Sequence, residues 1–563
     1  MLLLDFIEVK YSLILLHLPE DKHISMKGSF KSWSKKLHDI SNRYDKESNE
    51  QKISLLKAIA AKPLPLSVSL IGYFYTLLFI MSFPPDEKTR NLAISEVERM
   101  AALLKKQSPA IQERFVNSGI PFTKYRSYFS HDCARWLLSH PDASVHIHKI
   151  ENTMFDLNEV LKITLAPVMR SVTTAGFSNE EIFRELIPAK KYELPFIVNE
   201  LSRLDEHPYI KDHYFEGLGL ITDIVPENKT LSKAYNRIDI PSFFYHDEIL
   251  KKFDVRELLD RKIPNAAILS SEEKKHLIRV IKNSMLVTER ETDPATYLKE
   301  DSLRLYHLER GVSVALYGMP ADRQLPMESY IGYTMFKNGY PAAYAGGWVF
   351  GWRSDYGLNI YDQFRGGESA YMVAQILRVY RQVFGVNYFL VEASQFGLDN
   401  EEGIATGVFW FYYKLGFRPI DPALKKLAES EYQKIISRKS YRSSKKTLLK
   451  FTDSNIGFEL GKKIQPGVYD ISARVKEMLV RKYSGNFIRA EKDCVDEFLK
   501  KTGVKSSFNK AETEVLREVS LWAAAMKITD PEKLNLMLQM IKLKPTDEYQ
   551  YQAKLRLFFE SYS

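Results

Sequence analysis

Hydrophobic residues in the first half of the chain recur at intervals of three and four positions, with charged residues between them. This spacing is typical of amphipathic helices, in which the apolar side chains share one face. Breaks that contain proline adjoin or separate most of these segments. The pattern predicts helices at residues 52–61, 89–106, 155–168, 179–187 and 272–285.

The pattern changes near residue 300, where aromatic residues, β-branched residues and glycines become frequent. Such runs are typical of strands, and Asn338-Gly339 is a hairpin-turn signal because glycine accepts a positive φ. The sequence therefore predicts a group of antiparallel strands in this region. The expected strands are residues 311–318, 330–336, 342–350 and 358–364.

The next segment reads as helix, strand and helix. We predict a helix over 370–384, a short strand over 388–391 and a second helix around 408–415 that stops at Gly416. Glycine after a helix is a common C-terminal cap. The chain then becomes basic, and helical patterning returns beyond about residue 465.

Two apolar segments are candidates for a membrane span or an export signal. Residues 64–83 form a twenty-residue run without charge, but Pro65, Gly72 and several hydroxyl side chains interrupt its apolar character, which favours a buried core helix. Residues 1–22 contain Asp5 and Glu8 and have no positively charged start, which argues against a signal peptide. We therefore expect no stable membrane insertion.

The composition indicates the cellular compartment in which the protein is expected, but it does not indicate a function. The chain has 563 residues, a formal net charge of +9 and only two cysteines. Its length predicts several domains, and two distant cysteines exclude a disulfide scaffold. We expect a cytoplasmic protein. His146 and His148 would share one face of a strand, but they have no third ligand at suitable spacing in the sequence, so we expect no metal site.

The turn before residue 370 has the composition of a phosphate cradle. Gly366-Gly367 precedes the predicted helix, and free backbone N–H groups at a helix N-terminus attract anions. Glycines allow an anion to approach the backbone closely. Taken alone, two glycines before a helix are more often a tight connection between a strand and a helix.

The segment Phe411-Tyr412-Tyr413-Lys414-Leu415-Gly416-Phe417 resembles the end of the helix that follows the fifth strand in GNAT-type N-acetyltransferases. The order of predicted elements from about residue 300 to 460 is similar to that family. The longer segment 395–419 also resembles a group of functionally uncharacterised bacterial proteins with an N-terminal helical region. The resemblance implies an α+β multidomain protein. It would consist of a mainly helical domain at 1–295, with further division of that domain left open, a GNAT-like mixed α/β domain at 296–462 and a helical region at 463–563.

The resemblance also implies a cosubstrate and a site. Acetyl-CoA or another acyl-CoA would bind at the glycine loop, and an amine from a small molecule or peptide would attack the thioester. Tyr412 would protonate the departing thiolate, and Glu392, at the end of the fifth strand, would accept the amine proton; Glu368 is a second candidate base. The residues expected to bind the coenzyme are Gln363, Arg365, Gly366, Gly367, Glu368, Ser369 and Asn400.

Two alternatives remain open at this point. Glu368 stands where the family carries a small residue, and a carboxylate there would repel a pyrophosphate, which favours an inactive scaffold or interaction domain. Residues 425–450 hold nine Lys/Arg against two glutamates, which would suit nucleic acid and an aminoacyl-tRNA-dependent transferase of similar fold. A solvated basic face gives the same pattern, so nucleic acid binding is not the favoured interpretation.

Overall fold

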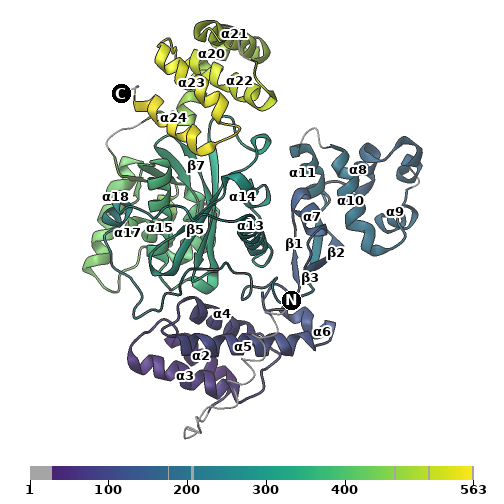
Figure 1. The fold of residues 1–563 in the computed structure, drawn as a ribbon, viewed down its shortest axis with the longest axis vertical. Coiled ribbons are helices and arrows are strands. Elements are labelled where there is room, and N and C mark those ends of the chain that lie inside the picture. Colours follow the sequence, from purple (N-terminus) through teal and green to yellow (C-terminus); the bar gives the residue numbers. More distant parts are fainter. Residues whose placement is uncertain (1–27, 175, 205–207, 462–464, 505–506, 561–563) are drawn as a thin grey trace.

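The computed structural model describes residues 28–174, 176–204, 208–461, 465–504 and 507–560. It is a mixed α/β protein built around one large sheet. Figure 1 shows helices from the start of the chain at one end of this sheet and the C-terminal helices at the other, with a separate lobe to one side. Residues 1–22, where we expect no signal peptide, lie outside the described residues.

The first helices surround the uncharged segment 64–83. Helix α4 (Ser69–Ser82) is almost wholly buried, because its neighbours cover its apolar side chains and Tyr73 donates a hydrogen bond to the Glu96 carboxylate. No helix in the described ranges is both long and apolar enough to cross a bilayer. Helices α2 (Phe30–Ile40) and α5 (Glu87–Lys105) pack against α4, and α3 (Lys46–Ala60) packs against α2 and α5; the short α6 (Pro109–Gln112) follows.

The lobe contains a small antiparallel sheet of order β1-β3-β2. The region before residue 296, predicted to be mainly helical, therefore also contains three strands. The sequence placed His146 and His148 on a strand, which is β2, but it did not predict the sheet, because β2 and β3 pair across about seventy residues of intervening chain. The elements of the lobe are β1 (Tyr125–Ser127), α7 (His131–Leu138), β2 (Ala143–Ile150), α8 (Leu157–Thr164), α9 (Asn179–Leu186), α10 (Glu193–Leu201), α11 (Pro208–Gly217) and β3 (Leu220–Pro226).

Three further helices precede the large sheet: α12 (Val255–Asp260), α13 (Ser271–Leu286) and α14 (Asp293–Thr296). Helix α13 begins at a capping box made by Ser270 and Glu273. Its apolar face shares a hydrophobic cluster with the first strands of the large sheet. Residues before 296 therefore contribute directly to the packing of the central sheet.

The large sheet has the order β11-β12-β10-β8-β7-β6-β5-β4, and β9 pairs separately with β7. Its strands are antiparallel except for β8 and β10, which run parallel. The hairpin between β6 and β7 turns at Asn338 and Gly339, with φ of 47° and 86°. The strands are β4 (Arg304–His307), β5 (Val312–Tyr317), β6 (Ser329–Lys337), β7 (Tyr340–Phe350), β8 (Arg353–Tyr356), β9 (Asn359–Ile360), β10 (Tyr388–Val391), β11 (Arg418–Pro419) and β12 (Ile456–Glu459).

Helix α15 (Ser369–Phe384) connects β8 and β9 to β10 and buries most of its length against the sheet. Gly385 ends it in the left-handed conformation. Two more helices, α16 (Glu401–Thr406) and α17 (Val408–Leu415), follow β10, and Gly416 caps α17. The strand expected at 358–364 is largely wrong. Only β9 is a strand, and a turn of 3₁₀ helix at Asp362–Phe364 replaces the remainder.

The C-terminal helices form their own hydrophobic cluster, which includes Trp522 and reaches Phe350 and Trp352 beside the sheet. Gln552 fixes the last helix to the sheet: its side chain accepts from Gly351 N–H and donates to the Val349 carbonyl. The remaining helices are α18 (Pro422–Ser437), α19 (Lys445–Phe451), α20 (Val468–Tyr483), α21 (Phe487–Thr502), α22 (Lys510–Ala525), α23 (Pro531–Leu543) and α24 (Glu548–Glu560).

Candidate active site

A cavity of about 450 Å³ lies on one face of the central sheet, at strands β6, β7 and β8. Tyr330, Trp348 and Asp355 are direct register partners on these strands and line it together. The rings of Tyr330 and Trp348 stack with centroids 4.4 Å apart. Helix α15 covers the opposite face, where Tyr380 contacts the backbone at Gly347. This cavity therefore opens away from α15.

The parallel pair β8 and β10 separates at one edge of the cavity. Pairing ends at Asp355 and Leu390, after which β8 continues along β7 and β10 continues along β12. Gly357 and Glu392 lie just beyond this point, and both line the cavity. Leu358 N–H donates to the Gln395 side chain across the separation, at 3.3 Å. The structure thus brings Glu392 to the point where the two strands diverge.

Three carboxylates line this cavity, those of Glu328, Asp355 and Glu392, and no Lys or Arg side chain of the described residues does. Arg353 lies beside it and pairs with Asp355 at 3.1 Å. The carboxylates of Glu328 and Glu392 form no hydrogen bond or ion pair with any residue that the structure describes. The lining of the cavity is therefore acidic in a protein whose net charge is positive.

Glu328 has the electrostatics of a base that works near neutral pH. Burial raises its pKa to about 7, and the negative charge of Asp355 adds to this effect, while Arg353 and Lys544 oppose it. A carboxylate with such a pKa exchanges protons readily at pH 7. Sequence reasoning missed this residue, because a glutamate before a strand has no distinctive signal. Its aromatic and acidic neighbours come together only when the strands pair.

Tyr412 lies deep in the protein, not on the cavity wall. Its ring packs against Phe417 with centroids 5.5 Å apart, and burial raises the pKa of its hydroxyl. It is close enough to Tyr356 to influence the titration of that residue, and Tyr356 does line the cavity. Tyr412 is therefore protonated at neutral pH, but it stands one residue layer behind the cavity.

Part of the expected glycine loop faces a second cavity, of about 580 Å³. Gln363, Arg365 and Gly366 line it on one side, and Lys31 and Lys35 of α2 line it on the other. Gly366 has a φ of +88°, and its surroundings are open, so nothing blocks approach to this part of the backbone. The loop residues and two lysines thus have the chemistry to hold phosphates.

Gly367 and Arg365 are more constrained. The α-carbon of Gly367 packs against the Phe83 ring, where a side chain would collide. Arg365 pairs with Asp362 at 3.0 Å and also with Glu402, so an incoming anion would have to compete with two carboxylates. Its guanidinium is half exposed, which leaves it accessible for that exchange.

The expected coenzyme contact by Glu368 is wrong for its side chain. The carboxylate is only 1% exposed and points into the protein, where it pairs with Arg310 at 2.6 Å and Lys337 at 2.7 Å. It also accepts from the Leu250 N–H. Burial opposes ionisation, but His246 and the two cations outweigh it and lower the Glu368 pKa. Glu368 therefore fixes the start of α15 and does not face the loop.

Asn400 is also committed to local structure. Its side-chain oxygen accepts from Gly403 N–H at the start of α16, and its amide donates to the Ser394 carbonyl at 3.1 Å. These bonds cap the helix, so contact of the Asn400 side chain with a coenzyme would break the capping hydrogen bond. Ser369, the first residue of α15, is half-buried, and no side-chain hydrogen bond to another described residue occupies it. Only Ser369 of these two is available.

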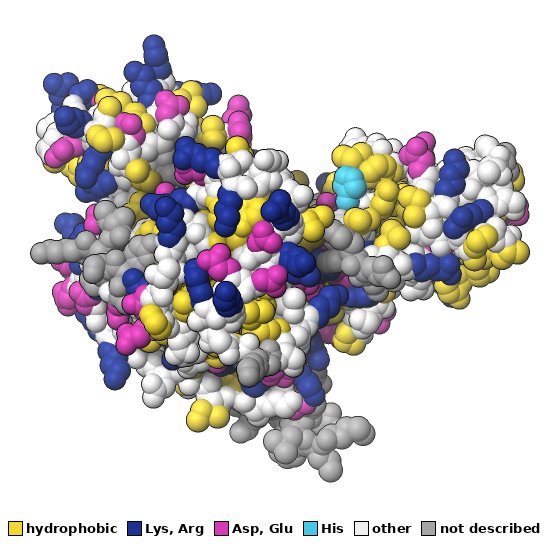
Figure 2. Space-filling view, turned by 90° about the horizontal axis from the view of Figure 1, so that it is seen from above, with side chains coloured by type: hydrophobic (Ala, Val, Ile, Leu, Met, Phe, Trp, Pro, Cys, Tyr) yellow, Lys and Arg dark blue, Asp and Glu magenta, His cyan; other side chains and the backbone are white. Residues whose placement is uncertain are grey.

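The basic stretch 425–450 lies on α18, α19 and the loop between them, and all nine Lys/Arg side chains are exposed. Lys434 pairs with the buried Glu431 at 2.7 Å. On the face drawn in Figure 2, Lys and Arg side chains are scattered among acidic and hydrophobic ones and do not merge into one patch. The exposure of all nine side chains and the local pairing of Lys434 with Glu431 are features of a solvated face, and nucleic acid binding remains a prediction.

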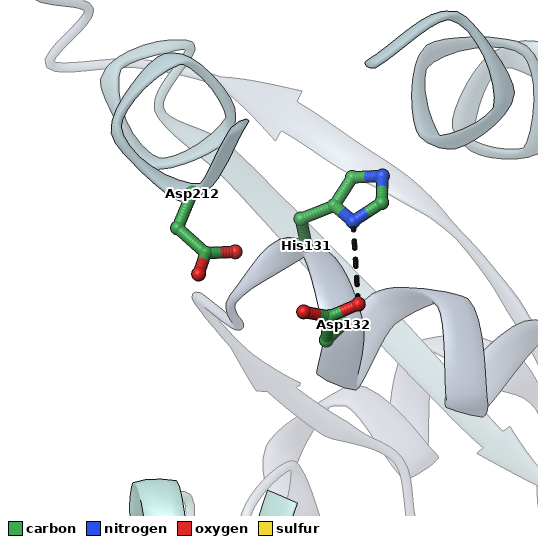
Figure 3. Close-up of side chains that lie close together, drawn as sticks. All are labelled: His131, Asp132 and Asp212. Atoms are coloured by element: carbon green, nitrogen blue, oxygen red, sulfur yellow. Dashed lines mark ion pairs between the residues drawn. The ribbon is translucent and has the colours of Figure 1, made fainter. Parts of the chain in front are cut away.

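His131, Asp132 and Asp212 bring three potential ligand atoms within 4.8 Å of one another in the lobe (Figure 3). Cations already surround the two carboxylates, since Arg323 contacts both and Arg135 contacts Asp132 at 2.7 Å. A divalent ion would have to displace or repel these groups. The cluster therefore serves as an ion-pair network.

His146 and His148 lie on β2 and both approach Asp223, at 3.8 Å and 3.5 Å. Arg126 already binds this carboxylate through two nitrogens. The two histidines therefore lie beside a carboxylate that the sequence did not reveal, but the Arg126 guanidinium already binds that carboxylate.

Comparison with known proteins adds no assignment: no protein-family model matches the chain, and no curated protein or solved structure resembles it significantly. The functional interpretation therefore depends on the geometry described above and on the resemblance at residues 411–417.

Proposed function

We propose that the protein is an acyl-CoA-dependent N-acyltransferase, with acetyl-CoA as the simplest donor. The observation that carries this proposal is the acidic cavity at the divergence of β8 and β10, which contains Glu328 with a pKa near 7. Acyl transfer to an amine needs a gap where a thioester can enter and a base that accepts the amine proton. Both requirements meet at this cavity.

The arrangement of elements supports this proposal. The chain runs from β8 through the glycine loop to α15, then to β10 and α17, and the parallel pair β8/β10 lies inside the sheet, with strands on both sides. This is the order that the resemblance at Tyr412–Phe417 implies for a GNAT-like domain at about 296–462, between mainly helical regions. Fold-level similarity alone does not establish chemistry, so the side chains carry the argument.

The coenzyme fits the loop in part. Gln363, Arg365 and Gly366 border the 580 Å³ cavity, and Lys31 and Lys35 supply positive charge opposite them. We assign the phosphates to this side and the acyl group to the strand gap. The inward orientation of Glu368 removes the repulsion that favoured an inactive scaffold, because its charge is balanced by Lys337 and Arg310. Gly367, Glu368 and Asn400 have structural roles in this scheme.

In the proposed reaction, the amine nitrogen attacks the thioester carbonyl carbon and Glu328 accepts the proton that the nitrogen loses. The carbon–sulfur bond then breaks, and the thiolate leaves as coenzyme A after it gains a proton. Glu392 at the strand end would orient the ammonium group before it is deprotonated. Tyr412 is proposed as the proton source for the thiolate only if the sulfur reaches the layer behind Tyr356.

The test combines binding and turnover. Acetyl-CoA should raise the melting temperature of the full chain by ligand linkage, and amine-dependent release of free thiol should follow. Glu328→Gln should lower turnover at least about a hundredfold, the usual scale for loss of a general base, while the thermal shift persists. Glu514→Gln, at an exposed site on α22, is the matched control. Absence of both binding and thiol release with acyl-CoAs would contradict the proposal.

Tyr412 has its own test. Tyr412→Phe removes one buried hydroxyl and keeps the ring packing against Phe417. If Tyr412 protonates the thiolate, turnover falls while acetyl-CoA binding is unchanged. Unchanged turnover would remove Tyr412 from the mechanism but would leave the proposal for Glu328 intact.

A further inference from the structure

We infer that the acceptor is a small aliphatic amine with at least two cationic groups, bound in the acidic cavity at β6, β7 and β8. This inference rests on the proposed function for the reaction, but the recognition itself is argued from the cavity. A cavity of about 450 Å³ is in the size range of small-molecule sites.

Charge is the first argument. Arg353 pairs directly with Asp355, whereas Glu328 and Glu392 form no ion pair with any described residue, although Arg353 and Lys544 act on Glu328 at longer range. Two carboxylates without a partner, on the wall of a partly enclosed site, attract cations more strongly than they would in water. A ligand that brings two positive charges would pair with both.

The aromatic wall is a second and independent argument. Tyr330 and Trp348 stack on each other and line the cavity beside Asp355. Aromatic faces attract alkylammonium groups through the ring quadrupole, and they also pack against methylene chains. An aliphatic polyamine offers both kinds of surface. An anionic ligand would be repelled by the carboxylates, and a neutral ligand would leave their charge uncompensated.

A second charge on the acceptor would favour the reaction. The nitrogen that attacks the thioester must lose its proton, so it no longer contributes a positive charge at the moment of reaction. A monoamine would therefore lose its electrostatic attraction when it becomes reactive. A diamine or polyamine keeps one ammonium group on Glu392 or Asp355 while Glu328 deprotonates the other.

The C-terminal helices complete the cavity. Val468, Tyr469 and Ser472 at the start of α20 line it opposite the sheet. Tyr469 is 79% exposed, so its ring stands at the edge and can cover an aliphatic chain. Figure 1 shows these helices against one end of the sheet. This explains why the acceptor site involves residues beyond 462, outside the strands that carry the reaction.

The experiment measures binding to the full chain by isothermal titration calorimetry, without acyl-CoA. The four probes are spermidine, putrescine, butylamine and butanediol. We expect spermidine and putrescine to bind, butylamine to bind at least about fivefold more weakly than putrescine, and butanediol not to bind. Affinity should fall as salt concentration rises. Equal binding of putrescine and butylamine, or no binding of either diamine or polyamine, would overturn the inference.

Variants identify the site. Glu328→Gln and Glu392→Gln should each weaken spermidine binding about fivefold, and the double variant should weaken it more than either. Glu514→Gln should bind as the natural chain does. Circular dichroism and the melting temperature check that each variant is folded. Unchanged affinity in the folded double variant would overturn the inference.

The outcomes separate this inference from the proposed function. Selective spermidine binding without any acyl transfer would support the cationic site and contradict the acyltransferase. Acyl transfer to an uncharged aromatic amine, with no binding of spermidine, would support the acyltransferase and overturn the cationic acceptor.

Discussion

Glu328 shows how the strength of one acid depends on its neighbours. Its carboxylate is half-buried, and the charge of Asp355 adds to the effect of burial. Nothing in the local sequence Pro326-Met327-Glu328-Ser329 indicates this environment. Only the pairing of β6 with β7 and of β7 with β8 places Asp355 nearby. Glu392 differs, because its position at the end of a predicted strand was readable from the sequence.

The pH dependence of acyl transfer tests this environment. Glu328 acts as a base only when deprotonated, so kcat/KM should rise as the pH passes about 7 and then level. Asp355→Asn removes a negative charge that raises the Glu328 pKa, so the rise should move to lower pH by about one unit. Measurements of kcat/KM between about pH 5 and pH 9, which span the titration of such a carboxyl group, would detect this change. An identical midpoint in the variant would show that another group controls the rate.

Glu368 is a residue whose predicted role changed. The sequence placed it at the loop, and its side chain instead joins Lys337 and Arg310 in the interior. Removal of one partner from a buried ion pair leaves the others uncompensated. Glu368→Gln should lower the free energy of unfolding by about 3 kcal/mol in urea titrations. Glu402→Gln, which breaks an exposed pair with Arg365, should cost less than about 1 kcal/mol.

The sign of the pH effect follows from the lowered pKa of Glu368. The folded state holds the carboxylate ionised to lower pH than the unfolded state does. Its contribution is therefore complete above the ordinary glutamate pKa and is lost as the pH falls below it. Glu368→Gln should accordingly reduce the acid sensitivity of stability, and an equal acid dependence in both proteins would contradict this role.

At the scale of elements, prediction succeeded where the pattern is local. The strand Tyr388–Val391 and the helix Val408–Leu415 lie where the sequence predicted them, because a short apolar run and a glycine stop are local signals. The strand expected at 358–364 was wrong, since apolar and aromatic residues there turn inward as a 3₁₀ turn, with Phe364 buried. The acidic cavity was not predictable, because it needs the register of three strands.

The cap of α17 gives a prediction about one element. Gly416 has a φ of +113°, and a β-carbon there would lie 2.6 Å from the Phe458 ring of β12. Gly416→Ala should therefore combine backbone strain with a steric collision and cost about 2–4 kcal/mol of stability. Gly503→Ala at the end of α21 is the control, because its φ is also positive and nothing crowds the site. It should cost about 1 kcal/mol, and equal losses in denaturant unfolding would contradict the collision.

At the scale of the molecule, the sequence predicted a mainly helical region before residue 296 and left its division open. The structure places parts of this region in two different hydrophobic clusters. Helices α2–α5 share the core of the central sheet, as Phe74 and Phe364 illustrate. The β1-β3-β2 lobe has a separate cluster that includes Ile147 and Phe215 (Figure 1). Helical periodicity reports which face of a helix is apolar, but it does not report which neighbour covers that face. The hydrophobic pattern therefore could not predict which distant parts of the chain pack together.

Arg323 links the lobe to the central region, because it pairs with Asp132 of α7 and with Asp212 of α11 at 3.2 Å. Burial opposes ionisation of Asp132, but His131 and the surrounding cations lower its pKa. Arg323→Met would leave two carboxylates short of a partner and should destabilise the lobe by about 3 kcal/mol. Hydrogen exchange should quicken in β2, β3 and α11 while β6 and β7 stay protected.

The control is Arg135→Met, which removes a half-exposed partner of the same Asp132 and should cost less than about 1 kcal/mol. Because the Asp132 pKa is lowered in the folded state, this stabilisation is complete above the ordinary aspartate range and is lost as the pH falls through it. The natural lobe should therefore become more like the Arg323→Met lobe as the pH falls. If exchange instead quickened equally in the lobe and in the central sheet, the two would unfold as one unit, and Arg323 would be part of a common core and not a link between two parts.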